Sequence, residues 1–270
     1  MLSLFLTAAL VANTLAAPAV VVGPRADTAC TREALKAHAA TLIAAQTAGK
    51  PDSIVALTGP DFVYTEDAKS ADLAKGVLTL PLRIDHSRSI YDTTQCATYS
   101  EIISTDPKNP RVVGTQMRFD SSASKLTKIE TLVTMQGDWL FNATATNMYA
   151  SREDTLWTEI PEAQRDSRAV IQAAGDAYLD LFNNKSTVVP WGTPCQRLEG
   201  GAYTGRGSPS DSCNVGVPSG VPIVNRRYVI DEVLGTVDAF VTFASVPDSH
   251  EFRVEKGKLR LVHTLTVMRK

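Results

Sequence analysis

The last strand-like segment of the chain carries a histidine in an apolar setting. Residues 258–268 read KLRLVHTLTVM, and their alternation predicts a strand with Leu259, Leu261, His263 and Leu265 on one side. We expect this side to face the helices, which places His263 in an apolar pocket. Burial there disfavours the imidazolium form and lowers the pKa of the histidine, which is one way in which general acids and bases are tuned.

An earlier segment repeats this pattern with a carboxylate in place of the histidine. Residues 125–135, KLTKIETLVTM, align with the final strand without a gap and put Glu130 at the position of His263. An apolar pocket raises the pKa of a carboxyl group. The simpler alternative is that both residues are hydrogen-bonded core groups, or that a one-residue slip turns both to solvent.

An imidazole that moves protons is usually oriented by a second group. Asp238, Asp231 and Glu232 are the nearby candidates, and each of them is also an ordinary strand charge. We carry Asp238 forward with His263 and Glu130 as the catalytic hypothesis.

Residues 190–214, PWGTPCQRLEGGAYTGRGSPSDSCN, form a long stretch without periodicity. Such stretches are either disordered or functional. Two cysteines would close this one, and its Trp and Tyr can cover an apolar ligand. We therefore predict an ordered lid, although its Arg and Glu could simply pair with each other. With neighbouring helix and strand positions, the ligand-binding hypothesis comprises Trp191, Arg197, Glu199, Tyr203, Arg226 and Tyr178.

Other titratable residues have simpler explanations. His38 falls within a helix pattern, and His250 falls in the polar segment PDSHE, which we interpret as a turn. Asp85, His86 and Arg88 cluster in RIDHSRSIYD at a density typical of a solvated turn or edge strand. We treat that cluster as a weak second site.

The architecture follows from internal similarity. Besides the two segments above, VVGTQMRF (112–119) resembles VLGTVDAF (233–240), and HAATLIAAQ (38–46) resembles QAAGDAYLD (172–180). Three matches in one order indicate two copies of one unit. In each copy a helix pattern precedes strand patterns, which predicts an α+β fold: two tandem cone-shaped units, 27–150 and 158–270, each with N-terminal helices packed on a curved antiparallel sheet.

A helical cone packed into a curved sheet resembles the nuclear-transport-factor-2-like (SnoaL-like) fold. The second half also resembles a fungal secreted protein family of unknown function, through IPEAQRDSRAVIQAAGDAYLDLF, VPWGTPCQRLEGGAYTG, DSCNVGVPSG, NRRYVIDEVLG and VHTLTVM, together with GDWLFNA in the first half. The fold resemblance implies a pocket between sheet and helices. Dehydratases, isomerases, cyclases and non-catalytic binders all use such a pocket, so the fold does not choose among them.

The N-terminus predicts export. Residues 1–17 contain an apolar run followed by small residues, as in a signal peptide, although no basic residue precedes the run. A retained anchor is the alternative, but Asn13 and Pro18 interrupt it. We predict a secreted protein, extracellular or in the cell wall, with no membrane contact after cleavage. In that compartment we expect disulfides Cys30–Cys96 and Cys195–Cys213 and glycosylation at Asn142 and Asn184.

Composition limits the partners. Lys and Arg total 27 and Asp and Glu 29, which gives no basic footprint for nucleic acid. The sequence has no metal-binding spacing, dinucleotide fingerprint, phosphate loop or serine-hydrolase elbow, so we expect no metal and no cofactor. Three functions follow: a cofactor-free lyase, isomerase or cyclase acting on a small apolar molecule; a non-catalytic binder of such a molecule; or a surface interaction protein. The oligomeric state is not predicted.

Overall fold

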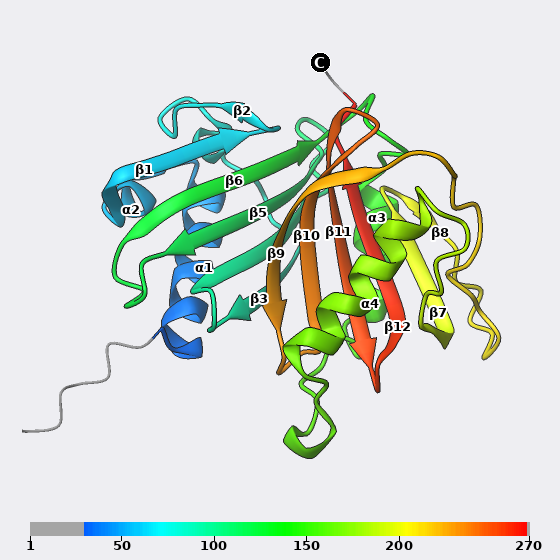
Figure 1. Cartoon of the computed structure of the whole chain (residues 1–270). Coiled ribbons are helices and arrows are strands. Elements are labelled where there is room, and N and C mark those ends of the chain that lie inside the picture. The colour runs from blue at the N-terminus through cyan, green and yellow to red at the C-terminus, as the bar shows by residue number, and fades with distance from the viewer. Residues whose placement is uncertain (1–29, 269–270) are drawn as a thin grey trace, which may run out of the picture.

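The computed structural model describes residues 30–268, and within them the predicted pair of α+β units is confirmed (Figure 1). The signal-peptide prediction lies outside these residues. The first unit contains α1 (Arg32–Ala48), α2 (Asp52–Val55), a short 3-10 helix (Val77–Thr79) and six strands: β1 (Thr58–Glu66), β2 (Lys69–Ser70), β3 (His86–Asp92), β4 (Ala97–Ser104), β5 (Arg111–Phe119) and β6 (Leu126–Thr134).

The second unit repeats this plan. It contains a 3-10 turn (Glu162–Gln164), α4 (Arg168–Leu181) and the strands β7 (Trp191–Glu199), β8 (Ala202–Tyr203), β9 (Ile223–Asp231), β10 (Thr236–Phe243), β11 (Val246–Glu255) and β12 (Lys258–Thr266). The sheet orders are β2-β1-β6-β5-β4-β3 and β8-β7-β12-β11-β10-β9. The two sheets therefore have the same topology, as the repeat predicts.

Two details differ from the expectation. Each sheet is mixed rather than wholly antiparallel, because β1 lies parallel to β6 and β7 lies parallel to β12. The sequence patterns did not reveal β1 or β7. The match between 112–119 and 233–240 was also wrong, because it pairs β5 with the turn and strand of β10, whereas β5 corresponds to β11 in the sheet order.

Local sequence explains the helix ends. Thr31 caps α1 by accepting a hydrogen bond from the Ala34 amide. Ser167 caps α4 by accepting a hydrogen bond from the Val170 amide, so this helix begins after the 3-10 turn. A third helix that the patterns did not reveal, α3 (Ala143–Glu153), follows the first sheet and is capped by Asn142.

The faces of the two sheets that do not carry their own helix pack against each other. Ile90, Tyr99 and Leu132 of the first sheet form one apolar cluster with Val229 and Phe240 of the second. Further along, side chains from β4, β5, β7 and β12 meet α3 in a second cluster. Many strand residues that look solvated in the sequence are therefore buried between the units.

Both predicted disulfides are confirmed. Cys30 is bonded to Cys96 in the first unit and Cys195 to Cys213 in the second. No helix among residues 30–268 is both long enough and apolar enough to span a bilayer.

Candidate functional site

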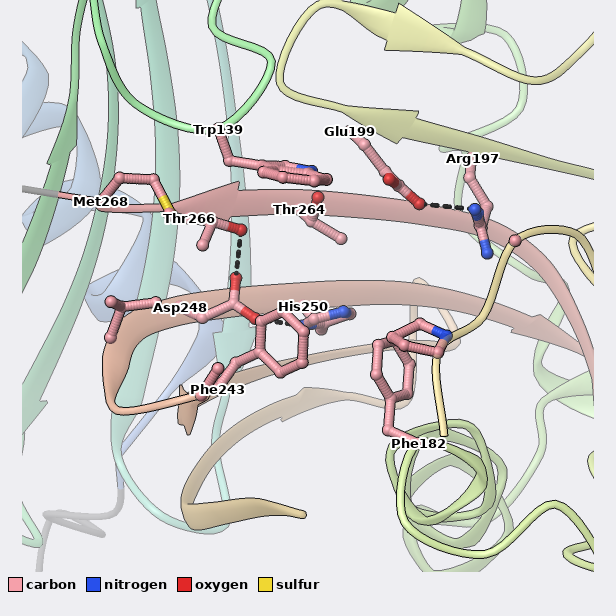
Figure 2. Close-up of a pocket in the computed structure, with 14 residues that line it drawn as sticks. Trp139, Phe182, Arg197, Glu199, Phe243, Asp248, His250, Thr264, Thr266 and Met268 are labelled. Carbon is pink, nitrogen blue, oxygen red and sulfur yellow. Dashed lines mark hydrogen bonds and ion pairs between the residues drawn. The ribbon is translucent and has the colours of Figure 1, made fainter. Parts of the chain in front are cut away.

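The second unit encloses a cavity of about 460 Å³ between its sheet and the end of α4. Much of the wall is apolar, and Phe182 at the C-cap of α4 packs edge-to-face against Phe243 of β10 at 5.5 Å between ring centroids (Figure 2). The other lining residues come from β7, the 216–218 segment, the β10–β11 hairpin, β12 and the segments around Trp139 and Met268. This cavity has the size and lining of a small-molecule site.

A histidine–aspartate pair lies in this cavity. Asp248 and His250 alternate with Phe252 along β11, so all three point to the helix side of the sheet. His250 Nδ1 lies 3.1 Å from Asp248 Oδ2, and Asp248 Oδ1 accepts a hydrogen bond of 3.0 Å from the Thr266 hydroxyl. The second ring nitrogen of His250 points away from Asp248 (Figure 2).

Aromatic rings surround His250. Tyr178 and Phe182 lie 5.6 and 5.9 Å from it between ring centroids, and Phe252 stacks at 5.9 Å. His250 is 4 % exposed and Asp248 is 0 % exposed. The pair can thus hold and move a proton in a site from which a bound apolar ligand would exclude water.

A second charged pair forms part of the wall. Arg197 Nη2 lies 2.7 Å from Glu199 Oε1, and Arg197 Nη1 donates to the Cys213 carbonyl at 3.2 Å. The predicted ligand residues Arg197 and Glu199 therefore line the cavity, and they also pair with each other, which the sequence left as the alternative. With its charges paired, the cavity suits a neutral ligand.

The other four predicted ligand residues do not line the cavity. Tyr178 is buried beneath it and contacts the ring of His250. Trp191 packs edge-on against Tyr178 at 5.7 Å. Arg226 forms ion pairs with Asp176 and Asp180 of α4. Tyr203 stacks on Tyr149 of α3 and donates to Glu153.

The expectation that His263 faces the helices was wrong. Along β12, Leu259 pairs with Val254, whereas Leu261 pairs with Arg253, so one extra residue is inserted between them. A bulge of this kind turns every later side chain to the opposite face. His263 therefore points between the two sheets, and Glu130 does so too because β6 has a matching irregularity after Leu126.

His263 lies in a buried charged cluster, named here the interface cluster: Arg88, Glu101, Glu153, Glu251 and His263. His263 Nε2 lies 2.5 Å from Glu153, and Arg88 Nη2 lies 2.6 Å from Glu251 and 3.1 Å from His263 Nδ1. Burial alone lowers the pKa of His263, but the surrounding carboxylates, chiefly Glu153, outweigh it and raise this pKa to about 9. The expected lowering of this pKa was therefore also wrong.

Arg88 supplies positive charge at the centre of the interface cluster. Glu101, Glu251 and His263 bring possible metal-ligand atoms within 4.8 Å of one another. The Arg88 guanidinium already lies among them, 3.7 Å from Glu101, and its other face stacks on Trp157 at 3.9 Å. A bound cation would have to displace it, so we assign no metal to this cluster.

The remaining catalytic candidates also lie between the sheets. Asp238 accepts hydrogen bonds of 2.6 Å from Gln116 and Ser249, and burial raises its pKa well above the usual range. Glu130 pairs with Lys128 and with Arg227. The structure therefore does not bring His263, Asp238 and Glu130 together in one site.

The sequence interpretation missed His250 because PDSHE looks like a turn. The true turn is Ala244–Ser245, since Phe243 pairs with Val246. A signal was present: Val254, Phe252, His250, Asp248 and Val246 continue one period-2 pattern back along the chain.

The interior of the first unit differs from that of the second. Leu78 and Leu82 are buried there, and the Gln46 side chain donates to the carbonyls of Val77 and Leu80 at 2.9 and 2.8 Å. The segment after β2 thus fills space beside α1. The His250–Asp248 pair and its cavity lie in the second unit.

Comparisons with known proteins assign no activity to the chain. The pattern of a domain of unknown function (DUF8021) matches residues 164–266, within the second unit. No curated protein matches the chain.

Two similar solved structures are BvnE pinacolase from Penicillium brevicompactum and PrhC from Penicillium brasilianum NBRC 6234. The first is 12 % identical with a TM-score of 0.30 and covers 46 % of this chain and 93 % of its own. The second is 9 % identical with a TM-score of 0.27 and covers 45 % of this chain and 91 % of its own. At these TM-scores the likeness carries no argument about function.

Proposed function

We propose that the second unit binds a small, neutral, largely apolar molecule and moves a proton on it, with His250 as the acid or base and Asp248 as its partner. The observation that carries this proposal is the His250–Asp248 pair in a cavity of about 460 Å³. Dehydration, isomerisation and cyclisation each require such a transfer. The role that the sequence assigned to His263 passes to His250, because His263 is buried outside the cavity.

The polar groups suggest how the residues would divide the work. His250 would take or give the proton through Nε2, while Asp248, held by Thr266, would stabilise the imidazolium that forms. The paired Arg197 and Glu199 would stay neutral as a unit. The phenyl rings of Phe182 and Phe243, which contact each other, would form one apolar wall against the body of the ligand.

The proposal includes the setting of the protein. We infer secretion of a fungal protein from the resemblance and from the apolar N-terminus, and the two disulfides support an oxidising compartment. Asn142 and Asn184 are exposed, as glycosylation requires, and their modification stays a prediction. The unit limits 27–150 and 158–270 also stay part of the proposal.

The test measures proton transfer directly. A panel of neutral cyclic ketones in D₂O is incubated with the protein, and deuterium incorporation next to the carbonyl is followed by mass spectrometry. We expect exchange above the buffer rate, and a loss of about 100-fold or more in His250→Gln. His86→Gln is the matched control, because His86 pairs with the exposed Asp154 away from the cavity.

A second candidate is binding without catalysis. His250 Nδ1 and Asp248 Oδ2 are close but do not have hydrogen-bond geometry, which favours a pair that shapes the site without relaying protons. Equal exchange in the wild type and His250→Gln, with an apolar probe still bound in the cavity, would establish this function instead.

A further inference from the structure

The roof of the cavity comes from the first unit. Trp139 lies in the segment between β6 and α3, within the GDWLFNA motif, yet it lines the cavity of the second unit. In Figure 2 the indole is seen along its edge, near Thr264. One of its two faces is turned toward the side of the cavity where Asp248 and His250 lie. Trp139 is 50 % exposed as a residue, so the indole is not fully buried in the core.

Several contacts hold this segment over the cavity. Asp138 accepts hydrogen bonds of 2.8 Å from the amides of Met135 and Met268, and Met268 lines the cavity beside Trp139. The Gly201 amide donates to the Leu140 carbonyl at 2.8 Å. One carboxylate and one turn thus tie the end of the first sheet to the second unit on both sides of Trp139.

The Gly200–Gly201 turn is shaped for this contact. A Cβ atom added to Gly200 would lie 2.6 Å from the Trp139 carbonyl, and one added to Gly201 would lie 2.3 Å from the Asn142 Cβ. Gly200 also has a positive φ of 54°. The β7–β8 turn can approach the Trp139 segment this closely only because it has no side chains.

We propose that Trp139 is a ligand-contacting residue, so that the site of the second unit is complete only with the first unit in place. This inference rests on the proposed small-molecule function and deepens it by naming the ligand class: a neutral molecule with a flat conjugated or aromatic part. The flat part packs against the indole face, while a polar substituent reaches His250. A half-exposed tryptophan over an apolar cavity gains both buried area and ring stacking when such a ligand binds.

The test uses N-phenyl-1-naphthylamine, a neutral aromatic dye whose fluorescence rises in apolar sites, with the full chain. The variants are Trp139→Ala, Trp139→Phe and Leu140→Ala. Leu140 is the matched control, because it is the exposed neighbour in the same segment and does not line the cavity. Thr264→Phe fills the cavity from β12 and reports whether the dye binds there. Unfolding midpoints verify that each variant is folded.

We expect Trp139→Ala to weaken dye binding about 10-fold, Trp139→Phe to stay within about 3-fold of the wild type, and Leu140→Ala to have no effect. Thr264→Phe should abolish binding. Wild-type affinity in Trp139→Ala, with binding still abolished by Thr264→Phe, would overturn the role of Trp139 and leave the proposed function standing. Binding that survives Thr264→Phe would place the dye elsewhere and overturn both.

Discussion

His263 Nε2 lies 2.5 Å from a carboxylate oxygen of Glu153, and both side chains are at most 2 % exposed. Glu153 ends α3 and His263 lies on β12, so this contact joins the helix after the first sheet to the sheet of the second unit. The same carboxylate accepts hydrogen bonds from Trp157 and Tyr203. The pair therefore contributes to the packing of the two units on each other and does not line the cavity.

The His263–Glu153 contact predicts a pH-dependent stability. The pKa of His263 is about 9 in the folded chain and about 6.5 in an unfolded one. A pKa raised by folding contributes stability that is complete below pH 6.5 and is lost as pH rises toward 9. We expect the free energy of unfolding, measured with urea, to fall by about 3 kcal/mol over this interval.

Two variants check that the loss of stability comes from deprotonation of His263. His263→Gln cannot titrate, and Glu153→Gln removes the largest cause of the raised pKa. Both should be less stable than the wild type at pH 6 and should show a flatter decline between pH 6.5 and 9. If His263→Gln retained the wild-type slope, the decline would have to come from another group.

Arg88 is predicted to be essential to the interface cluster. It is the guanidinium among Glu101, Glu153 and Glu251, and its side chain is 8 % exposed. Arg88→Met leaves buried carboxylates without their counter-charge, which typically costs about 3–5 kcal/mol. We expect a loss of this size in the free energy of unfolding from urea titrations.

Arg83→Met is the control for Arg88→Met, because Arg83 pairs with Asp85 near the surface with 62 % of its side chain exposed. It should change stability by less than about 1 kcal/mol. Adding Glu251→Gln to Arg88→Met should recover part of the loss. Equal effects of Arg83→Met and Arg88→Met would mean that the buried charges do not need the guanidinium.

Much of the fold was readable from the sequence. The α1 pattern with its Thr31 cap, the two disulfides and strands β4, β5, β6, β10 and β12 follow from local signals. β7 was hidden because Gly192, Pro194 and the following Gly-Gly pair look like loop residues, although the strand pairs along β12. Local composition cannot reveal a strand whose partner lies more than 60 residues away.

The candidate site was harder to predict for two physical reasons. One extra residue in β12 reversed the face of His263, and a strict period of two cannot anticipate it. The packing of sheet on sheet also buries Glu101 and Glu251, which are ordinary strand charges in the sequence, beside His263. For His250 the difficulty was different. The alternation of side chains along β11 is regular, but Pro247 and Asp248 are residue types typical of turns, so the segment was interpreted as a turn.

Asp248 is predicted to act through His250. Asp248→Asn keeps the shape but removes the charge that stabilises the imidazolium, so ketone deuterium exchange should slow at least about 10-fold. Dye affinity should not change, because a neutral probe does not need that charge. Thr266→Val, which removes only the hydroxyl that bonds to Asp248, should have a smaller effect on exchange. Equal exchange in Asp248→Asn and the wild type would exclude Asp248 as a partner.

The Cys195–Cys213 disulfide is predicted to support both stability and the cavity. It closes a separation of 18 residues, which corresponds to about 3 kcal/mol in the chain-entropy treatment. The Cys213 carbonyl accepts from Arg197, and Gly216 and Pro218, which line the cavity, follow soon after. Replacing both cysteines with Ala should therefore lower the unfolding free energy and weaken dye binding together.

The Cys30–Cys96 disulfide provides the matched comparison, since it spans 66 residues within the first unit. Its removal should cost about 4 kcal/mol by the same treatment, because a longer loop loses more entropy when closed. Dye affinity of the folded protein should stay at the wild-type value, since neither cysteine lines the cavity. If removal of Cys30–Cys96 weakened dye binding while removal of Cys195–Cys213 did not, Arg197 and the 216–218 wall would not depend on the Cys195–Cys213 bond.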